Sequence, residues 1–308
     1  MTTITTLVIS GGAYNGLIEL GVLRRLSENG FYNINAVERI HGTSIGAFIA
    51  VLLALKMDWG DLVEYFVERP WHKLLSINPI ELYTKKGAFD KQFFISALSS
   101  LFAAKGLDIS TISLHEFKEY SNIELYFYAI KLSTFEVCAM TEPDLLLIDA
   151  INMSCCMPIV FRPVMYKGEY YIDGGIAANY PLREAIAAEN NAPDADGAAK
   201  NAPDADVNSH ILGITLDLGN TINASINENT NIVEYIYCLF NKISTIRKFN
   251  SVKIGTIPNE VVIRCDGMNA TDGYDTLFKR DKREEMVKRG ERIGDEWLMA
   301  RTAASPIL

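Results

Sequence analysis

The chain of 308 residues has few of the side chains that build disulfide frameworks or metal sites. It contains five cysteines, an odd number, and no two of them are spaced as Cys-x-x-Cys. A disulfide framework needs paired cysteines and a structural zinc site needs closely spaced ligands, so we expect neither. We predict reduced and mostly buried thiols at Cys138, Cys155, Cys156, Cys238 and Cys265.

The sequence also lacks an excess of positive charge and lacks long apolar runs. Its net charge of −9 argues against a nucleic-acid-binding protein, because such a protein presents a basic face. The basic residues at 279–292 alternate with acidic ones, which is typical of a solvated helix face. No uncharged apolar run reaches the roughly 18 residues that cross a bilayer, and no secretory signal opens the chain. We therefore expect a cytoplasmic protein that is able to dock peripherally on a membrane surface.

The hydrophobic pattern predicts strands alternating with helices. Strands at 5–12 and 37–42 are each followed by a helix, at 17–30 and 45–57, which is the start of a parallel α/β sheet. Further strands are predicted at 123–132, 135–140, 169–175, 210–218 and 259–265, and further helices at 62–66, 91–104, 114–120, 143–157, 181–190, 231–249 and 274–300. We expect a single domain over residues 1–308, with a helical C-terminal part at 231–302.

One segment does not fit this pattern. Residues 191–208 contain NAPDAD twice, ten residues apart, and have almost no apolar side chains to bury. This composition predicts a flexible surface insertion within the α/β unit. Its aspartates match no calcium-loop spacing, so we expect no metal there.

The stretch "HGTSIGAFIAVLLAL" contains a serine in the pattern G-x-S-x-G. Ser44 lies between a predicted strand and a predicted helix, with Gly42 and Gly46 on either side. On such a turn a serine hydroxyl is exposed at a helix N-terminus, where N–H groups favour a developing oxyanion. Ser44 is therefore either a nucleophile or a turn serine that caps the helix.

A second turn, "SGGAYNG" at 10–16, closes the first strand and opens the first helix. Consecutive N–H groups in such a turn form an anion-binding nest, which would serve as an oxyanion hole. The spacing is not GxGxxG and no P-loop lysine is present, which argues against nucleotide binding. A purely structural turn is the remaining alternative.

The proton acceptor for Ser44 is not an obvious histidine. His41 lies in the strand before the elbow, His72 in a loop, His115 at a helix start and His210 beside the insertion, and none occupies a setting typical of a catalytic base. Asp173 ends a predicted strand and precedes Gly174 and Gly175. A partly desolvated carboxylate in such a position can accept a serine proton directly, although an ordinary Asp-Gly turn has the same sequence.

Taken together, three motifs in this order resemble the patatin-like phospholipase family: "SGGAYNGLIELGVL", "GTSIGA" and "DGGIAANYPL". The intervening "INMSCCMPIVFRPV" resembles the same family, and the likeness covers about residues 7–187. The resemblance implies a three-layer α/β/α sandwich with a mostly parallel central sheet. It also implies phospholipase A-type cleavage of fatty-acyl esters by a Ser-Asp dyad through an acyl-enzyme.

Carried onto this sequence, the resemblance makes Ser44 the nucleophile and Asp173 the base. The amides of Gly11, Gly12 and Ala13 would form the oxyanion hole, supported by the motif glycines named above. No metal or organic cofactor is implied, and the expected partner is a phospholipid or other acyl lipid. Phe48, Phe161 and a loop at 77–83 could line an apolar channel.

The sequence departs from the family at two positions. Ala13 stands where a third glycine is usual, and Asn15 stands where arginine or lysine is usual. If residue 13 requires positive φ, alanine costs on the order of 1 kcal/mol. The same dyad would also serve an acyltransferase or a thioesterase, and the two departures are the only support for a weakly active lipid-binding module. A Ser-His-Asp hydrolase is disfavoured because its elbow follows several strands, whereas Ser44 follows about two.

Overall fold

The computed structural model describes residues 2–75, 77–191, 207–217, 257–265 and 270–304, and the single residues 228, 230, 235, 238, 239 and 242. The repeat of the predicted insertion and most of the helix predicted at 231–249 lie outside the described residues.

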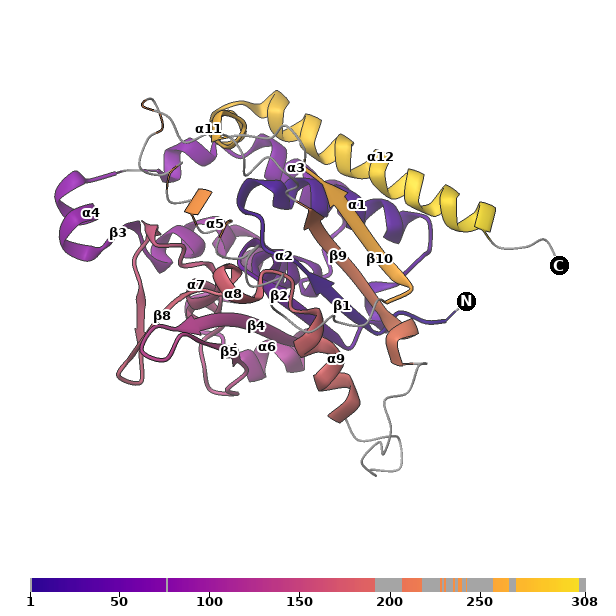
Figure 1. Cartoon of the computed structure of the whole chain (residues 1–308), viewed down its shortest axis with the longest axis horizontal. Coiled ribbons are helices and arrows are strands. Elements are labelled where there is room, and N and C mark those ends of the chain that lie inside the picture. Colours follow the sequence, from indigo (N-terminus) through magenta and orange to yellow (C-terminus); the bar gives the residue numbers. More distant parts are fainter. Residues whose placement is uncertain are drawn as a thin grey trace.

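The described strands and helices follow the predicted alternation (Figure 1). The strands are β1 (Thr6–Ile9), β2 (Arg39–Thr43), β3 (Gly87–Phe89), β4 (Glu124–Lys131), β5 (Glu136–Met140), β6 (Ile159–Phe161), β7 (Val164–Tyr166), β8 (Glu169–Asp173), β9 (Ile211–Asp217) and β10 (Asn259–Arg264). The α-helices are α1 (Gly16–Glu28), α2 (Ile45–Ala54), α3 (Trp59–Glu68), α4 (Pro79–Lys85), α5 (Lys91–Ala104), α6 (Leu114–Ser121), α7 (Leu147–Cys155), α8 (Gly175–Ala178), α9 (Leu182–Asn191), α11 (Ala270–Phe278) and α12 (Arg280–Ala304).

The central sheet is mixed but largely parallel, as predicted. Its strand order is β10-β9-β1-β2-β4-β8-β7, and β5 also pairs with β4. The strands from β10 to β4 run parallel, whereas β5 and β8 are antiparallel to β4 and β7 is antiparallel to β8. This order brings the ends of β1, β2 and β8 together, although β8 comes more than 120 residues after β2 in the chain.

Apolar side chains cover both faces of the sheet. In β1, Leu7 and Ile9 belong to the main core with α1, α2, α5, α7 and α12, whereas Val8 packs with Leu182 and Ala185 of α9 on the opposite face. Because successive side chains of a strand point to opposite faces, this division places helices on both sides of the sheet. The predicted three-layer α/β/α arrangement is confirmed.

Helices α1 and α12 lie side by side and approach each other closely at glycines (Figure 1). A Cβ atom added at Gly290 would lie 2.0 Å from the carbonyl oxygen of Ile18, and one at Gly21 would lie 2.2 Å from that of Val287. The clashing atoms belong to helix backbone, which cannot move aside as a side chain can. This contact therefore fixes α12 against the core.

The single helix predicted at 274–300 is wrong, because the structure divides this segment into α11 and α12 at Lys279. The buried guanidinium of Arg283 donates hydrogen bonds to the carbonyl oxygens of Thr276 and Leu277, at 3.0 and 3.4 Å. Since the last carbonyls of a helix have no partner within it, Arg283 stabilises the end of α11. The loop predicted at 77–83 is also wrong, because most of this segment is helical. Asn78 caps α4, and Pro79 is the first residue of the helix.

We expect Gly290→Ala to lower the free energy of unfolding by about 1–3 kcal/mol, because the added methyl group overpacks the contact between α1 and α12. Urea denaturation of the variant and of Gly294→Ala, whose Cβ would meet the Arg25 side chain rather than backbone, makes the comparison. Equal stability of the two variants would contradict the close approach at Gly290.

Candidate active site

Ser44 occupies the sharp turn between β2 and α2. Its φ and ψ are 55° and −124°, a conformation that L residues rarely adopt and that neighbouring structure must impose. A Cβ at Gly46 would lie 2.3 Å from the carbonyl oxygen of Ile9, and one at Gly42 would lie 2.5 Å from that of Gly46. Gly46 therefore allows the turn to pass close to β1, and Gly42 allows the end of β2 to pass close to the first turn of α2.

Asp173, the last residue of β8, is the hydrogen-bond partner of this serine. The Ser44 hydroxyl donates to Oδ2 of Asp173 at 2.7 Å, and the N–H of Gly175 donates to Oδ1, also at 2.7 Å. The carboxyl is only 4% exposed. Burial raises the pKa of Asp173 to about 6, and the hydrogen bonds from Ser44 and Gly175 partly oppose that shift.

Strand β4 lies between β2 and β8 and determines how close the two residues come. Thr43 is in register with Tyr128, and Ala129 is in register with Asp173. A Cβ at Gly174 would lie 2.2 Å from the carbonyl oxygen of Tyr128. The glycine after Asp173 therefore allows the chain to leave β8 directly over β4 and towards Ser44.

Two residues of α7 support the serine turn, and the sequence analysis gave them no role although they lie within the segment "INMSCCMPIVFRPV". The Ser44 N–H donates to Oγ of Ser154 at 3.1 Å, and this hydroxyl donates to the carbonyl oxygen of Tyr128 at 2.8 Å. The thiol of Cys155 donates to the carbonyl oxygen of Ser44 at 3.0 Å. Burial raises the pKa of the Cys155 thiol, which keeps it protonated as a donor. The only sequence signal was the small, polar end of the helix, "MSCC".

The glycine turn at 10–16 lies against Ser44, since a Cβ at Gly11 would be 3.1 Å from the Cβ of Ser44. The Gly11 N–H already donates to the carbonyl oxygen of Asn179 at 2.8 Å, and the Asn179 side chain donates back to the Gly11 carbonyl at 2.9 Å. No residue of the described chain accepts a hydrogen bond from the amides of Gly12 or Ala13. Of the three predicted oxyanion donors, these two are the ones available to a ligand.

The two departures from the family pattern take different places in this turn. Ala13 is exposed and has a φ of 50°, the conformation for which alanine costs about 1 kcal/mol or more. Asn15 is only 1% exposed, so a side chain at this position lies inside the protein rather than at its surface. The replacement of the usual cation by Asn15 therefore changes the interior beneath the turn.

A buried pair beneath the same turn attaches it to β9. The Ser10 hydroxyl donates to Oε1 of Glu19 at 2.8 Å and accepts from the N–H of Leu216 at 3.1 Å. Burial raises the pKa of Glu19 well above its usual range. Sequence reasoning did not identify Glu19, because a single acidic residue within an apolar helix pattern gives no sign of its partner.

The four histidines lie in surroundings other than those of a catalytic base. Nδ1 of His41 lies 2.7 Å from the hydroxyl of Tyr128, and burial lowers the pKa of His41 to about 3. His72 stacks on Phe278, His115 is exposed, and Nδ1 of His210 lies 2.8 Å from the carbonyl oxygen of Thr3. In the described part of the chain, no histidine is hydrogen-bonded to Ser44 or Asp173.

Comparison with protein families places this geometry in a known context. The patatin-like phospholipase model matches residues 7–186, more than half of the chain. The chain belongs to the patatin-like phospholipase family. The matched residues include the glycine turn at 10–16, Ser44 and Asp173.

Individual relatives are more distant. The chain is 28% identical over 192 residues to a probable lipid hydrolase, 463L, of Invertebrate iridescent virus 6, in an alignment that covers 60% of this chain and 64% of that protein. It is 24% identical over 183 residues to an uncharacterized protein of Acanthamoeba polyphaga mimivirus, covering 58% and 60% of the two chains. The chain thus spans less than two thirds of the length of these relatives.

Among solved structures, the crystal structure of VipD from Legionella pneumophila superposes with a TM-score of 0.54. The match has 17% sequence identity and covers 97% of this chain and 67% of that chain. This likeness supports the patatin fold. None of the described helices combines the length and the apolar character needed to cross a membrane.

The raised pKa of Asp173 makes a prediction about stability. A carboxyl whose pKa is higher in the folded protein stabilises the fold fully below its unfolded pKa, near 4, and that contribution is lost as the pH rises through about 6. Asp173→Asn removes this titration. We therefore expect the stability of the variant relative to the wild type to increase by about 1–3 kcal/mol between pH 4 and pH 7.

Urea denaturation of both proteins at a series of pH values measures this difference. Titration of the other carboxyl groups is common to the two proteins and cancels. A difference that stays constant, or that decreases with rising pH, would contradict the burial of an ionisable Asp173.

Proposed function

We propose that this chain is a lipid acyl hydrolase of the phospholipase A type, with Ser44 as nucleophile and Asp173 as general base. The observation that carries the proposal is the 2.7 Å hydrogen bond from the Ser44 hydroxyl to the buried Asp173 carboxylate, on a turn whose backbone is held in a rare conformation. Membership of the family supports an acyl lipid as substrate.

In the first step Asp173 Oδ2 takes the proton from Ser44 Oγ as Oγ attacks the carbonyl carbon of a fatty-acyl ester. The C=O π electrons move onto the carbonyl oxygen, which becomes an oxyanion. The N–H of the exposed residue Ala13 and the neighbouring N–H of Gly12 would donate to this oxygen. Collapse of the intermediate breaks the ester C–O bond, and Asp173 returns the proton to the departing alcohol.

The second step reverses these roles with water. Asp173 takes a proton from a water molecule whose oxygen attacks the acyl-Ser44 carbonyl. The new intermediate collapses, the bond to Oγ breaks, and Ser44 recovers a proton from Asp173. The products are a fatty acid and the free enzyme.

The environment of Asp173 explains how an aspartate could do the work of a histidine. A general base is most effective when its pKa lies near the working pH. An exposed aspartate, with a pKa near 4, is a weak base. Because burial raises the pKa of Asp173 to about 6, most of the population is ionised at neutral pH and is also a stronger base.

We expect Ser44→Ala and Asp173→Asn each to reduce the release of fatty acid from mixed phospholipid vesicles by at least about a thousandfold. The double variant should lose no more than Ser44→Ala alone, because the two residues act as one unit. The wild-type rate should rise with pH through a midpoint at about 6.

Ser133→Ala and Asp144→Asn serve as matched controls, since both residues are exposed and lie outside the dyad. Release that is equal in the wild type, Ser44→Ala and Asp173→Asn would refute the proposed dyad.

A further inference from the structure

We propose that α4 and the lysines around it form the surface by which this protein docks on an anionic lipid bilayer. The proposal rests on the proposed function, because a lipid acyl hydrolase must meet its substrate at a membrane surface. It adds the part of the molecule that makes the contact. We call this surface the α4 face and define it by Ile77, Ile80, Tyr83, Lys73 and Lys86.

The apolar part of the α4 face is largely exposed to solvent. Ile77, Ile80 and Tyr83 are 61%, 74% and 88% exposed. Their spacing of three residues places Ile80 and Tyr83 on one side of α4, directly after Ile77. Large apolar side chains grouped on one exposed helix face mark a contact site, and tyrosine is suited to the interface between headgroups and acyl chains.

The charge around α4 is opposite to that of the whole protein. Residues 71–91 contain four lysines and two acidic residues, a net charge of +2, whereas the chain as a whole has a net charge of −9. An acidic protein is repelled by an anionic bilayer except where such a basic segment faces it. The positive net charge of residues 71–91 therefore favours an anionic lipid bilayer as the surface that the α4 face binds.

One arginine, Arg162, forms ion pairs with both acidic side chains of this segment. Arg162 contacts Glu81 at 2.5 Å and Asp90 at 2.6 Å. Lys85 also pairs with Glu81, at 3.1 Å, and Lys91 pairs with Asp149, at 3.0 Å. The structure gives no ion pair to the exposed Lys73 and Lys86 with any described residue, so their charges are available to lipid phosphates.

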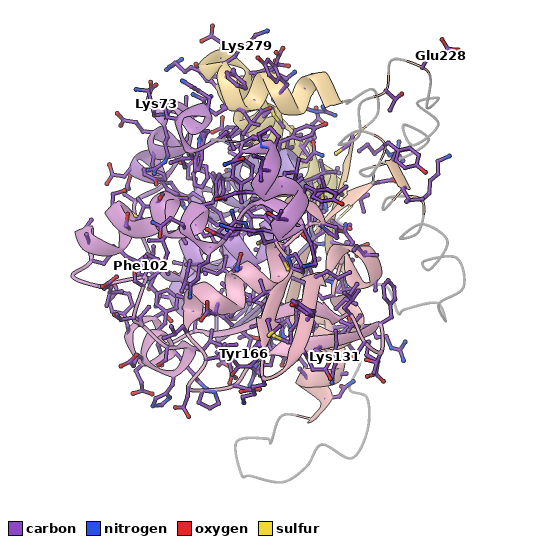
Figure 2. All side chains as sticks on the ribbon, turned by 90° about the vertical axis from the view of Figure 1, so that its left-hand side faces the viewer. Lys73, Phe102, Lys131, Tyr166, Glu228 and Lys279 are labelled. Carbon is purple, nitrogen blue, oxygen red and sulfur yellow. The ribbon has the colours of Figure 1, made fainter. Side chains whose placement is uncertain are left out.

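The α4 face forms one edge of the protein. In Figure 1 α4 protrudes at the left of the molecule, and Figure 2 looks onto that side, with Lys73 at its margin. Lys73 and Phe89 of β3 line the same surface depression together with Arg162. The two unpaired lysines thus flank the helix, Lys73 before it and Lys86 at its end.

The α4 face is also firmly connected to the candidate active site. Strand β3, which follows α4, pairs with β6, and the N–H of Arg162 donates to the carbonyl oxygen of Phe89 at 2.8 Å. Phe161 of β6 stacks on Phe94, with ring centroids 4.9 Å apart. The ring centroids of Phe94 and Phe48 of α2 are 6.2 Å apart. Helix α2 begins directly after Ser44, so a bilayer bound at α4 would be held in a fixed position relative to the dyad.

Binding to vesicles tests the proposal without requiring catalysis. All variants are made on the Ser44→Ala background, and their co-sedimentation is measured with vesicles of phosphatidylcholine alone and of phosphatidylcholine mixed with phosphatidylglycerol. We expect Ile80→Ser/Tyr83→Ser to weaken binding to the mixed vesicles at least about tenfold, because both side chains lose their apolar contact with the lipid. Lys73→Gln/Lys86→Gln should weaken binding to mixed vesicles about tenfold, and much less so at high salt.

Met299→Ser is the matched apolar control, since Met299 is 70% exposed on α12 and lies outside the α4 face. It should bind as the parent does. Ile80→Ser/Tyr83→Ser binding as tightly as Met299→Ser would overturn the proposal, as would equal binding of the parent to neutral and mixed vesicles. Dimers of the parent that dissociate in Ile80→Ser/Tyr83→Ser would also overturn it, in favour of self-association through α4.

These outcomes are separable from the proposed function. If wild type and Ser44→Ala release the same amount of fatty acid while the α4 variants lose vesicle binding, the dyad is refuted and the docking surface stands. If the α4 variants bind vesicles normally while Ser44→Ala releases no fatty acid, the docking surface is refuted and the dyad stands.

Discussion

The hydrogen bond between Ser44 and Asp173 is the interaction on which the rest of this structure depends. It joins residues 129 positions apart at 2.7 Å, and it exists only because three strands end at one place. Glycines at positions 42, 46 and 174 permit this convergence, since a Cβ at any of them would lie within 2.5 Å of a backbone atom. The fold thus maintains a close backbone contact whose direct result is the position of one hydroxyl group.

Burial gives this hydrogen bond its chemical character. Desolvation raises the pKa of Asp173, and the two donors at its oxygens limit the shift, so the carboxyl remains ionisable near neutral pH. The same desolvation disfavours the charged form and lowers stability above pH 6. In the proposed mechanism, activity and stability would therefore depend on the burial of Asp173 in opposite ways.

Much of the fold and the core of the site could be predicted from the sequence. The alternation of strands and helices predicted an α/β fold with a mostly parallel sheet. Helix α5 begins and ends where the hydrophobic pattern predicted. Ser44 stood out because its motif lies between a strand and a helix, which is typical of a nucleophile or of a capping serine. The resemblance to the family, carried by three short motifs, was needed to predict Asp173 as its base. These signals are local, so a single sequence contains them.

The remaining features depend on contacts between distant segments. Among the three predicted oxyanion donors, the Gly11 N–H is paired with the carbonyl oxygen of Asn179, and this pairing depends on where α8 ends relative to β1. The break at Lys279 depends on Arg283 reaching back to α11, which an uninterrupted helical pattern conceals. The exposure of α4 was likewise not predicted, because the segment that contains Ile80 and Tyr83 was expected to line an apolar channel and only the tertiary structure places these side chains at the surface.

Covalent labelling tests the central claim most directly. A fluorophosphonate probe reacts with a serine whose hydroxyl is activated as a nucleophile. Mass spectrometry of the labelled wild-type protein should find one adduct, on the peptide that contains Ser44, and Asp173→Asn should slow its formation strongly. An unlabelled wild type, or an adduct on a different serine, would contradict the account.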